Sequence, residues 1–315
     1  MRMDHAAWAL ALLLVPVCAA PALADTYNFS TRIDDDKPLL SASDIHMRFS
    51  QQGSEGDAGI VNERRDQTVA IQPPAAGPLR VRASESGGIR VQPSADGHWS
   101  ALVCMVAGAK SSADANAILD QLHIVAGAGT LTVEGPDDRD WSAYIVLSVP
   151  RDVALDLSAN NGDLGLRDVS GQFTARNENG PLSFVGTTGK VNAQAQNGPI
   201  QFRGHAGDIR LTADNGPIGV ELDAPSWAGA GLDAHADNGP VKFSAPEGYR
   251  TGVQLTGSEN SSITWKGGGR SAVLEQWYRT HSIKLGSGPV QIRLSTVNGP
   301  VEIRTPKETS GHVRI

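Results

Sequence analysis

The sequence has few aromatic residues, little charge and almost no cysteine. Aromatic residues make up 5% of its 315 positions and charged residues 19%, against 40% hydrophobic residues. This balance excludes an acid-rich disordered chain and a multi-span membrane protein, so we expect a folded protein. The net charge of −7 also argues against broad electrostatic attraction to nucleic acid or anionic lipid.

No apolar run is long enough to cross a membrane. The longest, Ala6 to Val17, follows Arg2 and precedes Ala22-Leu23-Ala24, which is the order of a secretory signal peptide with its cleavage site. About a dozen apolar residues are too few to span a bilayer. We therefore expect residues 1–24 to be a signal peptide, and an exported protein of the periplasm, the cell surface or the medium without a transmembrane span.

Cysteine occurs only as Cys18 and Cys104. Loss of the signal peptide removes Cys18, so no disulfide can form within the mature chain. Cys104 lies in the apolar run 101–106, which predicts a buried and inert thiol.

Glycine, by contrast, is abundant and periodic. Seven glycines stand nine residues apart, namely Gly162, Gly171, Gly180, Gly189, Gly198, Gly207 and Gly216. Apolar residues occupy the second and fourth positions after each glycine, as Leu182 and Phe184 do after Gly180. This alternation predicts short half-buried strands, each opened by a turn.

Every second glycine of the series follows an asparagine, so the repeating unit is eighteen residues. Asn-Gly permits a positive φ at a sharp corner, and the proline that usually follows is tolerated at the start of a strand. Asparagines stacked in this way are expected to bond to one another and not to a ligand. We interpret the following pairs as structural corners: Asn161 and Gly162, Asn179 and Gly180, Asn197 and Gly198, Asn215 and Gly216, Asn238 and Gly239, Asn298 and Gly299.

A coil of two short strands cannot bury its inner face alone, so the coils must stack on one another. The predicted fold class is all-β, a flattened β-solenoid of 18-residue coils over residues 160–304. Stacking would align Leu182, Ile200 and Ile218 in one column. The outward positions, among them Ser183, Gln201, Gly219 and Lys242, are mixed and carry no stripe of arginine interleaved with aromatics, so we expect no nucleic acid partner.

The remaining chain lacks the nine-residue period. Residues 25–86 are weakly patterned, whereas residues 87–159 predict a small α+β cap that leads into the solenoid. Ser112, an N-cap, opens a helix over Ala113 to Leu122 there. Val273 to His281 fits a helix or a strand, and residues 305–315 form a C-terminal tail.

Four stretches carry a resemblance to a known family: the helical pattern of Ala113 to Leu122 with the strands after it, Val149 to Leu157, Asn161 to Leu164, and Leu294 to Gly299. They resemble the bacterial putative-adhesin domain, a β-solenoid family of unknown function, and the resemblance extends over Gly87 to Ile303. This chain departs from it in preferring Asn-Gly-Pro to Asn-Gly-Asp. The resemblance implies a repeat fold and supplies no catalytic residues.

The repeat contains few residues that could bind a metal ion or catalyse a reaction. Calcium-binding nonapeptide repeats need paired glycines and a regular Asp, whereas Asp163 and Asp208 recur irregularly here, so we expect no metal and no cofactor. The β-helical enzymes that cleave polysaccharides gather acidic or basic groups on one face. His205 and His235 lie near turns without an evident carboxylate pair or nucleophile in the neighbouring outward positions, so we expect no catalytic residue.

The aromatic residues outside the columns are the candidates for surface binding. Trp227, Trp277 and Tyr278 lie in irregular segments, where an exposed ring could stack on a sugar or contact a protein. The alternative is that each ring caps the core at a repeat irregularity. We predict a non-enzymatic, adhesin-like or envelope-associated scaffold with an envelope protein or glycan as partner. The alternatives are a polysaccharide lyase or hydrolase on the same scaffold and a filament formed by self-stacking.

Overall fold

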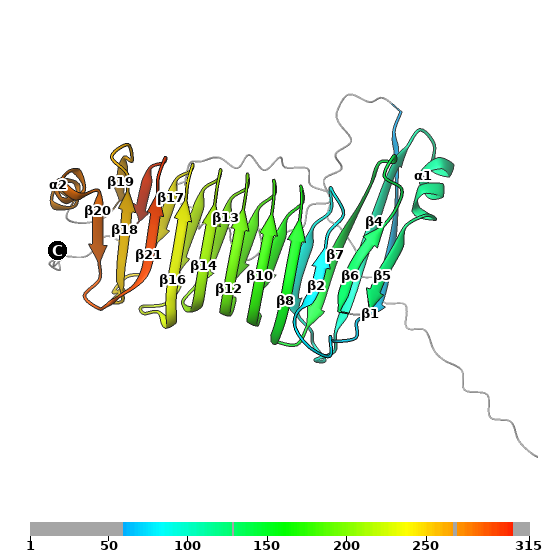
Figure 1. The fold of residues 1–315 in the computed structure, drawn as a ribbon, viewed down its shortest axis with the longest axis horizontal. Helices are drawn as coiled ribbons and strands as arrows, with labels where there is room; N and C mark the ends of the chain where they lie inside the picture. The colour runs from blue at the N-terminus through cyan, green and yellow to red at the C-terminus, as the bar shows by residue number, and fades with distance from the viewer. Residues whose placement is uncertain (1–58, 128, 267–269, 305–315) are drawn as a thin grey trace, which may run out of the picture. The chain divides into compact units, whose positions relative to one another are not determined.

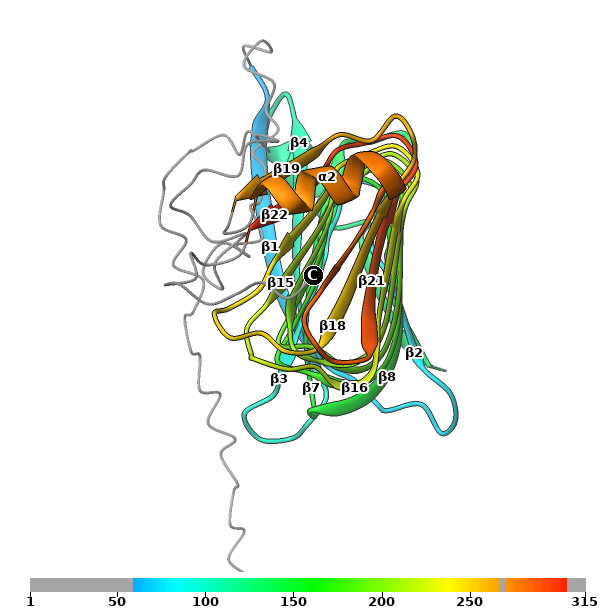
Figure 2. The same cartoon turned by 90° about the vertical axis from the view of Figure 1, so that its left-hand side faces the viewer.

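The computed structural model describes residues 59–127, 129–266 and 270–304, and these form two facing β-sheets (Figures 1 and 2). In spatial order, sheet A contains β1 (Val61–Ala70), β4 (Ser100–Ala109), β7 (Trp141–Val149), β3 (Ile89–Pro93), β9 (Leu164–Arg167), β11 (Leu182–Val185), β13 (Ile200–Gly204), β15 (Ile218–Leu222), β17 (Val241–Ser244), β22 (Val301–Arg304) and β19 (Ile263–Lys266). Sheet B contains β20 (Ser282–Leu285), β18 (Gly252–Gly257), β21 (Val290–Thr296), β16 (Ala228–Ala236), β14 (Ala206–Ala213), β12 (Thr188–Ala195), β10 (Ser170–Asn177), β8 (Asp152–Ala159), β2 (Leu79–Arg82), β6 (Thr130–Glu134) and β5 (His123–Gly127).

The repeat produces parallel strands stacked in register. Leu182 in β11 pairs with Ile200 in β13, which pairs with Ile218 in β15. The partner sheet repeats the arrangement, with Val191 beside Ile209. The predicted columns and the all-β, flattened fold class are therefore confirmed.

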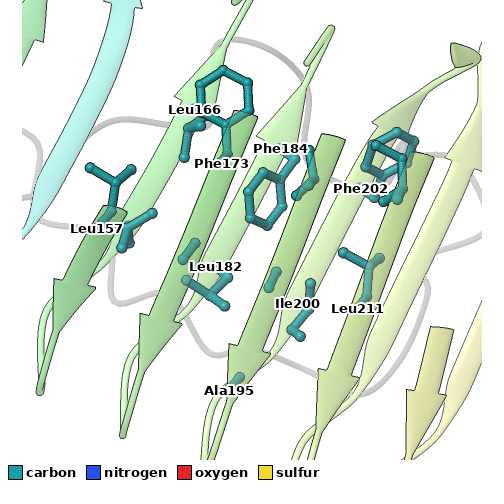
Figure 3. Packing of buried hydrophobic residues seen from close by; sticks show 14 of the residues in the cluster. Leu157, Leu166, Phe173, Leu182, Phe184, Ala195, Ile200, Phe202 and Leu211 are labelled. Carbon is teal, nitrogen blue, oxygen red and sulfur yellow. The ribbon is translucent and has the colours of Figure 1, made fainter. Parts of the chain in front are cut away.

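The core lies between the two sheets and is made of side chains that alternate along each strand (Figure 3). Phe184 and Phe202 stand side by side from sheet A, and the small Ala193 and Ala195 lie on sheet B. Large residues thus face small ones, as close packing across a thin layer requires. Full burial of each large apolar side chain stabilises the fold by about 1.5–3 kcal/mol.

The corner glycines are needed for space and not for a positive φ. A Cβ on Gly198 would lie 2.0 Å from the carbonyl oxygen of Gly180, and one on Gly180 would lie 2.0 Å from that of Gly162. Positive φ occurs instead at the alternate glycines, such as Gly171 (φ 129°) and Gly207 (φ 126°). The predicted corners are in place, but the conformational reason that the sequence suggested for them is wrong.

The strands before the repeat continue both sheets. Parallel β3 lies between β7 and β9 in sheet A, and β2 lies between β6 and β8 in sheet B. Antiparallel strands occur at this end, because β4 pairs with both β1 and β7. Helix α1 (Ser112–Leu119) is present where a helix was predicted, with Ser111 and not Ser112 as its N-cap.

A long insertion changes the order of the last coils. Residues 245–289 include β18 and β19, which join the two sheets beyond β21 and β22, so that β21 pairs with β16 although Ser295 and His235 are sixty residues apart. The insertion contains helix α2 (Arg270–Thr280), which packs against β19 and β20 at the end of the sheets (Figures 1 and 2). The segment from Val273 to His281, left open by the sequence, is therefore largely helical.

Candidate binding surfaces

One corner of each coil carries an asparagine whose amide contacts the next asparagine in the stack. Nδ2 of Asn179 donates to Oδ1 of Asn161 at 2.8 Å, and Asn197 makes the same bond to Asn179 at 2.9 Å. The bond repeats from Asn215 to Asn197 (3.1 Å), from Asn238 to Asn215 (3.1 Å) and from Asn298 to Asn238 (2.9 Å). Since these amides bond to one another, the asparagine ladder acts as a structural device.

A polar groove lies beside the asparagine ladder on the outward face of sheet B. It has a volume of about 650 Å³ and crosses five adjacent strands, from β2 to β14. This volume is in the range of small-molecule sites, but the groove is open and not enclosed. Its polar side chains come from Arg82, Ser158, Asn160, Arg176, Asn177, Glu178, Gln194, Gln196, Thr212 and Asp214.

Two arginines give one end of the groove its charge. Arg82 in β2 and Arg176 in β10 flank Ser158 in β8, because both are in register with it. Arg176 also donates from Nη1 to Oδ1 of Asp156 at 3.1 Å, which orients its guanidinium group. Guanidinium groups recognise planar carboxylates with two parallel hydrogen bonds, so this end fits a carboxylate-bearing ligand.

His235 lies between a hydroxyl and a carboxylate on the same face of sheet B. Its Nδ1 is 2.8 Å from Oγ of Ser295, and its Nε2 is 2.9 Å from Oδ1 of Asp237. His205 likewise has Nδ1 at 2.7 Å from Oδ1 of Asp223. The expectation that neither histidine has a carboxylate pair or nucleophile beside it is therefore wrong for His235, because strand pairing brings the hydroxyl of Ser295 to it across sixty residues. Among the described residues, His205 has a single carboxylate beside it and no pair.

The Ser295–His235–Asp237 contact has the residue types of a hydrolytic triad without its surroundings. Acyl transfer also needs donors aimed at the developing oxyanion. In the part of the chain that the structure describes, β16 and β21 pair as parallel strands around Ser295, which occupies the backbone N–H groups nearby. We therefore interpret these contacts as cross-strand hydrogen bonds.

Two of the three aromatic binding candidates are buried. Trp227 donates from Nε1 to the carbonyl oxygen of Gly207 at 3.2 Å and packs against Phe202 with ring centroids 5.9 Å apart. Trp277, a residue of α2, is fully buried and donates from Nε1 to the carbonyl oxygen of Ser261 at 3.0 Å. Neither indole presents a stacking face, because each plugs the core where the repeat is interrupted.

Tyr278, the third aromatic candidate, is exposed. It retains 72% of its surface on α2, next to buried Trp277. Exposure of one ring does not test whether it binds a partner, so the binding role of Tyr278 stays a prediction.

Part of the outward face of sheet A is buried. Ser183, Gln201 and Lys242 point away from the core, yet they are 8%, 9% and 5% exposed. The outward residues Lys190 and Asp208 of sheet B are exposed. Gly219 accounts for part of the difference, since its missing Cβ leaves room that the side chain of Gln201 occupies.

Burial shifts the ionisation of charged groups on the outward face of sheet A. Desolvation raises the pKa of Asp163 to about 6, against the opposing effects of a backbone hydrogen bond and Arg90. Desolvation also raises the pKa of Glu221, although Arg203 lies 3.4 Å away, and lowers the pKa of Lys242. This face therefore disfavours charge that lacks a close partner.

Within residues 59–127, 129–266 and 270–304, no group of three His, Cys, Asp or Glu side chains is placed to hold a metal ion. In the same residues, no helix has the length and apolar character needed to cross a membrane. The predicted signal peptide and C-terminal tail lie outside the described residues.

These features define the class of the molecule: an all-β protein whose two large sheets are built mainly from stacked two-strand coils. Similar solved structures include a putative adhesin from Parabacteroides distasonis (11% identity, TM-score 0.46, 77% of this chain and 97% of that chain) and a putative adhesin from Bacteroides fragilis (12%, 0.37, 77% and 97%). A putative lipid binding protein from Parabacteroides distasonis is also similar (9%, 0.28, 76% and 96%). No family model matches the chain, nor does any curated protein.

Proposed function

We propose that this protein is an exported, non-enzymatic scaffold that binds an extended glycan of the cell envelope in the polar groove of sheet B. One observation carries the proposal: side chains from five adjacent strands line a single groove. Successive strands are about 4.8 Å apart, so the groove offers donors and acceptors at regular intervals. A polymer of similar sugar units can use such an array at several positions at once. The predicted signal peptide supports export.

The side chains of the groove favour a sugar that carries a carboxylate. Arg82 and Arg176 supply guanidinium donors at one end, while Gln194 and Gln196 supply amides that can bond to hydroxyl groups. We therefore infer that the groove binds a polyuronate in preference to a neutral glucan.

The test compares the unmodified protein with the double variant Arg82→Ala/Arg176→Ala in calorimetric titrations with alginate and with dextran. We expect alginate to bind more tightly than dextran and the double variant to lose at least about tenfold in affinity for alginate. Lys190→Ala, an exposed residue of sheet B outside the groove, is the control and should bind normally. Equal binding of alginate by both proteins would contradict the proposal.

The enzymatic alternative has one observation in its favour. Glu178 and Asp214 line the same groove directly after the ends of β10 and β14, two strand spacings apart, which is about 10 Å and near the separation of inverting glycosidase carboxylates. Release of reducing or unsaturated ends from alginate, abolished in Glu178→Gln/Asp214→Asn, would establish an enzyme. The proposal predicts that no such product forms.

Self-stacking is opposed at both ends of the sheets. Edge strand β1 carries Glu63, Arg64, Arg65 and Asp66, and charge on an edge strand discourages pairing with another chain. At the other end α2 packs against β19 and β20. We therefore propose that single molecules bind the glycan.

A further inference from the structure

The polar groove of sheet B is part of an outward row of residues that continues beyond it. Strand register places five members of this row in the groove and four more on β16, β21, β18 and β20, which follow β14 in that order (Figure 1). Every member is polar and none is acidic. We call these nine residues the polar row: Arg82, Ser158, Arg176, Gln194, Thr212, His235, Ser295, Thr256 and Ser282.

Beyond the groove, a second outward row runs beside the polar row on the side away from the asparagine ladder. Its members are exposed, whereas the members of the polar row next to them are half-buried. Register sets this second row as Arg210, Asp233, Arg293, Gln254 and Lys284. A polymer on the polar row would therefore lie on short hydroxyl side chains, such as those of Ser295 and Thr256, with longer side chains along one edge.

The charges beside the polar row favour a polymer that carries carboxylates. The second row holds three basic residues against one acidic residue, Asp233. On the other side, next to the asparagine ladder, Asp214 and Asp237 follow the ends of β14 and β16. Carboxylates are attracted to the first side and repelled by the second, so a polyuronate would direct them toward Arg210, Arg293 and Lys284.

Several donors on this extension are available to a ligand. Among the residues that the structure describes, the guanidinium group of Arg293 and the hydroxyl groups of Thr212 and Thr256 make no side-chain hydrogen bond or ion pair. The hydroxyl of Ser295 is instead held by the ring of His235, with Oγ 2.8 Å from Nδ1. A side chain that is already ordered loses little entropy on binding, and a free donor gives up no protein contact.

The polar row is about twice as long as the groove. From β2 to β14 there are four strand spacings, about 19 Å, and from β2 to β20 there are eight, about 38 Å. One sugar unit of an extended polymer is about as long as one strand spacing, so the groove has room for about four units and the polar row for about eight. An oligomer longer than the groove would therefore meet further donors along the polar row.

We propose that a polyuronate bound in the groove continues along the polar row across β16, β21 and β18, where Arg293 binds one of its carboxylates and Thr256 bonds to one of its hydroxyl groups. The inference rests on the proposed function of the groove and extends the binding site to strands that do not line the groove. It also gives His235 and Ser295 a place in the binding surface that needs no catalysis.

The test titrates the unsubstituted protein and Arg293→Ala/Thr256→Val calorimetrically with an alginate tetramer and an alginate octamer. Valine keeps the shape of the threonine side chain and lacks its hydroxyl. We expect octamer affinity to fall at least about fivefold in the variant, whereas tetramer affinity should be unchanged because Arg82 and Arg176 hold the tetramer in the groove. Gln172→Ala/Lys190→Ala, at two exposed positions of sheet B outside both rows, is the matched control and should bind both oligomers normally.

Tetramer binding separates this inference from the proposed function. If both proteins bind the tetramer and also bind the octamer equally, the groove is a binding site but the polar row does not extend it, and the inference is overturned. If neither oligomer binds the unsubstituted protein, the proposed function fails and the inference fails with it. Loss of tetramer affinity in Arg293→Ala/Thr256→Val would also overturn the inference, because the substitutions would then not act on the extension alone.

Discussion

The two sheets share one repeat and one core, yet their outward faces differ. Sheet B presents charged side chains to water, such as Lys190 and Asp208, and carries the polar groove. Sheet A presents Gly165, Ser183 and Gly219 at the equivalent row, together with Gln201 and Lys242, and these five residues are buried. The core fixes the alternation along each strand but places no demand on the outward positions. Those positions can therefore differ in function between the two faces.

Small residues on one face have a physical consequence. Glycine and serine let another chain approach the sheet closely, whereas lysine and aspartate hold it away and keep water near the strands. The small residues of sheet A are thus suited to close approach by another chain, and the exposed charged residues of sheet B, with their open groove, are suited to a hydrated ligand. The predictions below test whether this division is real.

The largest expected effect comes from a residue on which both faces depend. Gly198→Ala would place a Cβ 2.0 Å from the carbonyl oxygen of Gly180, so two coils would have to move apart. We expect a loss of about 3 kcal/mol in the free energy of unfolding, measured by chemical denaturation. Hydrogen exchange should speed up equally in β13 of sheet A and β14 of sheet B.

Gly127→Ala is the control for that substitution, because a Cβ there meets nothing within 4 Å. Its free energy of unfolding should change by less than about 0.5 kcal/mol. Faster hydrogen exchange in one sheet alone would mean that Gly198→Ala destabilises the two sheets separately. It would contradict the assumption that both faces share one core.

The parts of this fold that the sequence predicts are those set by a local period. The nine-residue spacing and the alternation after Gly180 determine both the register and the column from Leu182 to Ile218, so each could be derived without coordinates. The asparagine ladder follows from the same spacing. Local steric rules act on every coil alike, which is why one repeat unit suffices.

What the sequence did not predict depends on contacts between distant segments. Ser295 meets His235 only because β18 and β19 join the sheets one position farther out and β21 returns to lie between β16 and β18. For Trp227 and Trp277 the sequence offered two readings, exposure or capping of the core, and the burial that decides between them depends on how irregular segments fold back onto the core. The nine-residue period predicts neither the groove beside Arg176 nor the burial of Ser183, because packing of the core does not restrict which residues occupy the outward positions.

A charge placed on each face tests their difference directly. Ser183→Lys would put an ammonium group at a position that is 8% exposed, and we expect it to lower the free energy of unfolding by about 2 kcal/mol. Gln172→Lys places the same group on the exposed face of sheet B, where the change should stay within about 0.5 kcal/mol. Thermal or chemical denaturation measures both, and equal effects would remove the distinction between the faces.

The ionisation of Asp163 gives the sheet A face a pH dependence. Because its pKa is raised from 3.8 to about 6 in the folded protein, the folded state binds more protons than the unfolded state between these values. Stability contributed by the protonated carboxyl group is therefore present below pH 3.8 and is lost as the pH rises through about 6. Asp163→Asn should not suffer this loss.

We accordingly expect Asp163→Asn to gain about 1.5 kcal/mol over the unsubstituted protein between pH 4 and pH 7, after allowance for solvent screening. Asp233→Asn on sheet B is the matched control, and we expect its effect to stay within about 0.5 kcal/mol. Denaturation curves at several pH values would measure both. A difference between Asp163→Asn and the unsubstituted protein that does not change with pH would show that water reaches this carboxyl group.

The smallest effect is expected at the corner that joins the two faces. Asn197→Ala removes the bonds to Asn179 and Asn215, at 2.9 Å and 3.1 Å, and should lower the free energy of unfolding by about 1 kcal/mol. Asn192→Ala, on sheet B away from the corner, should cost less than about 0.5 kcal/mol. Because the asparagine ladder borders the groove but does not line it, alginate affinity should be nearly unchanged in Asn197→Ala. A loss of alginate affinity as large as that of the arginine double variant would contradict this. It would mean that Asn197 contacts the ligand and is not a structural residue alone.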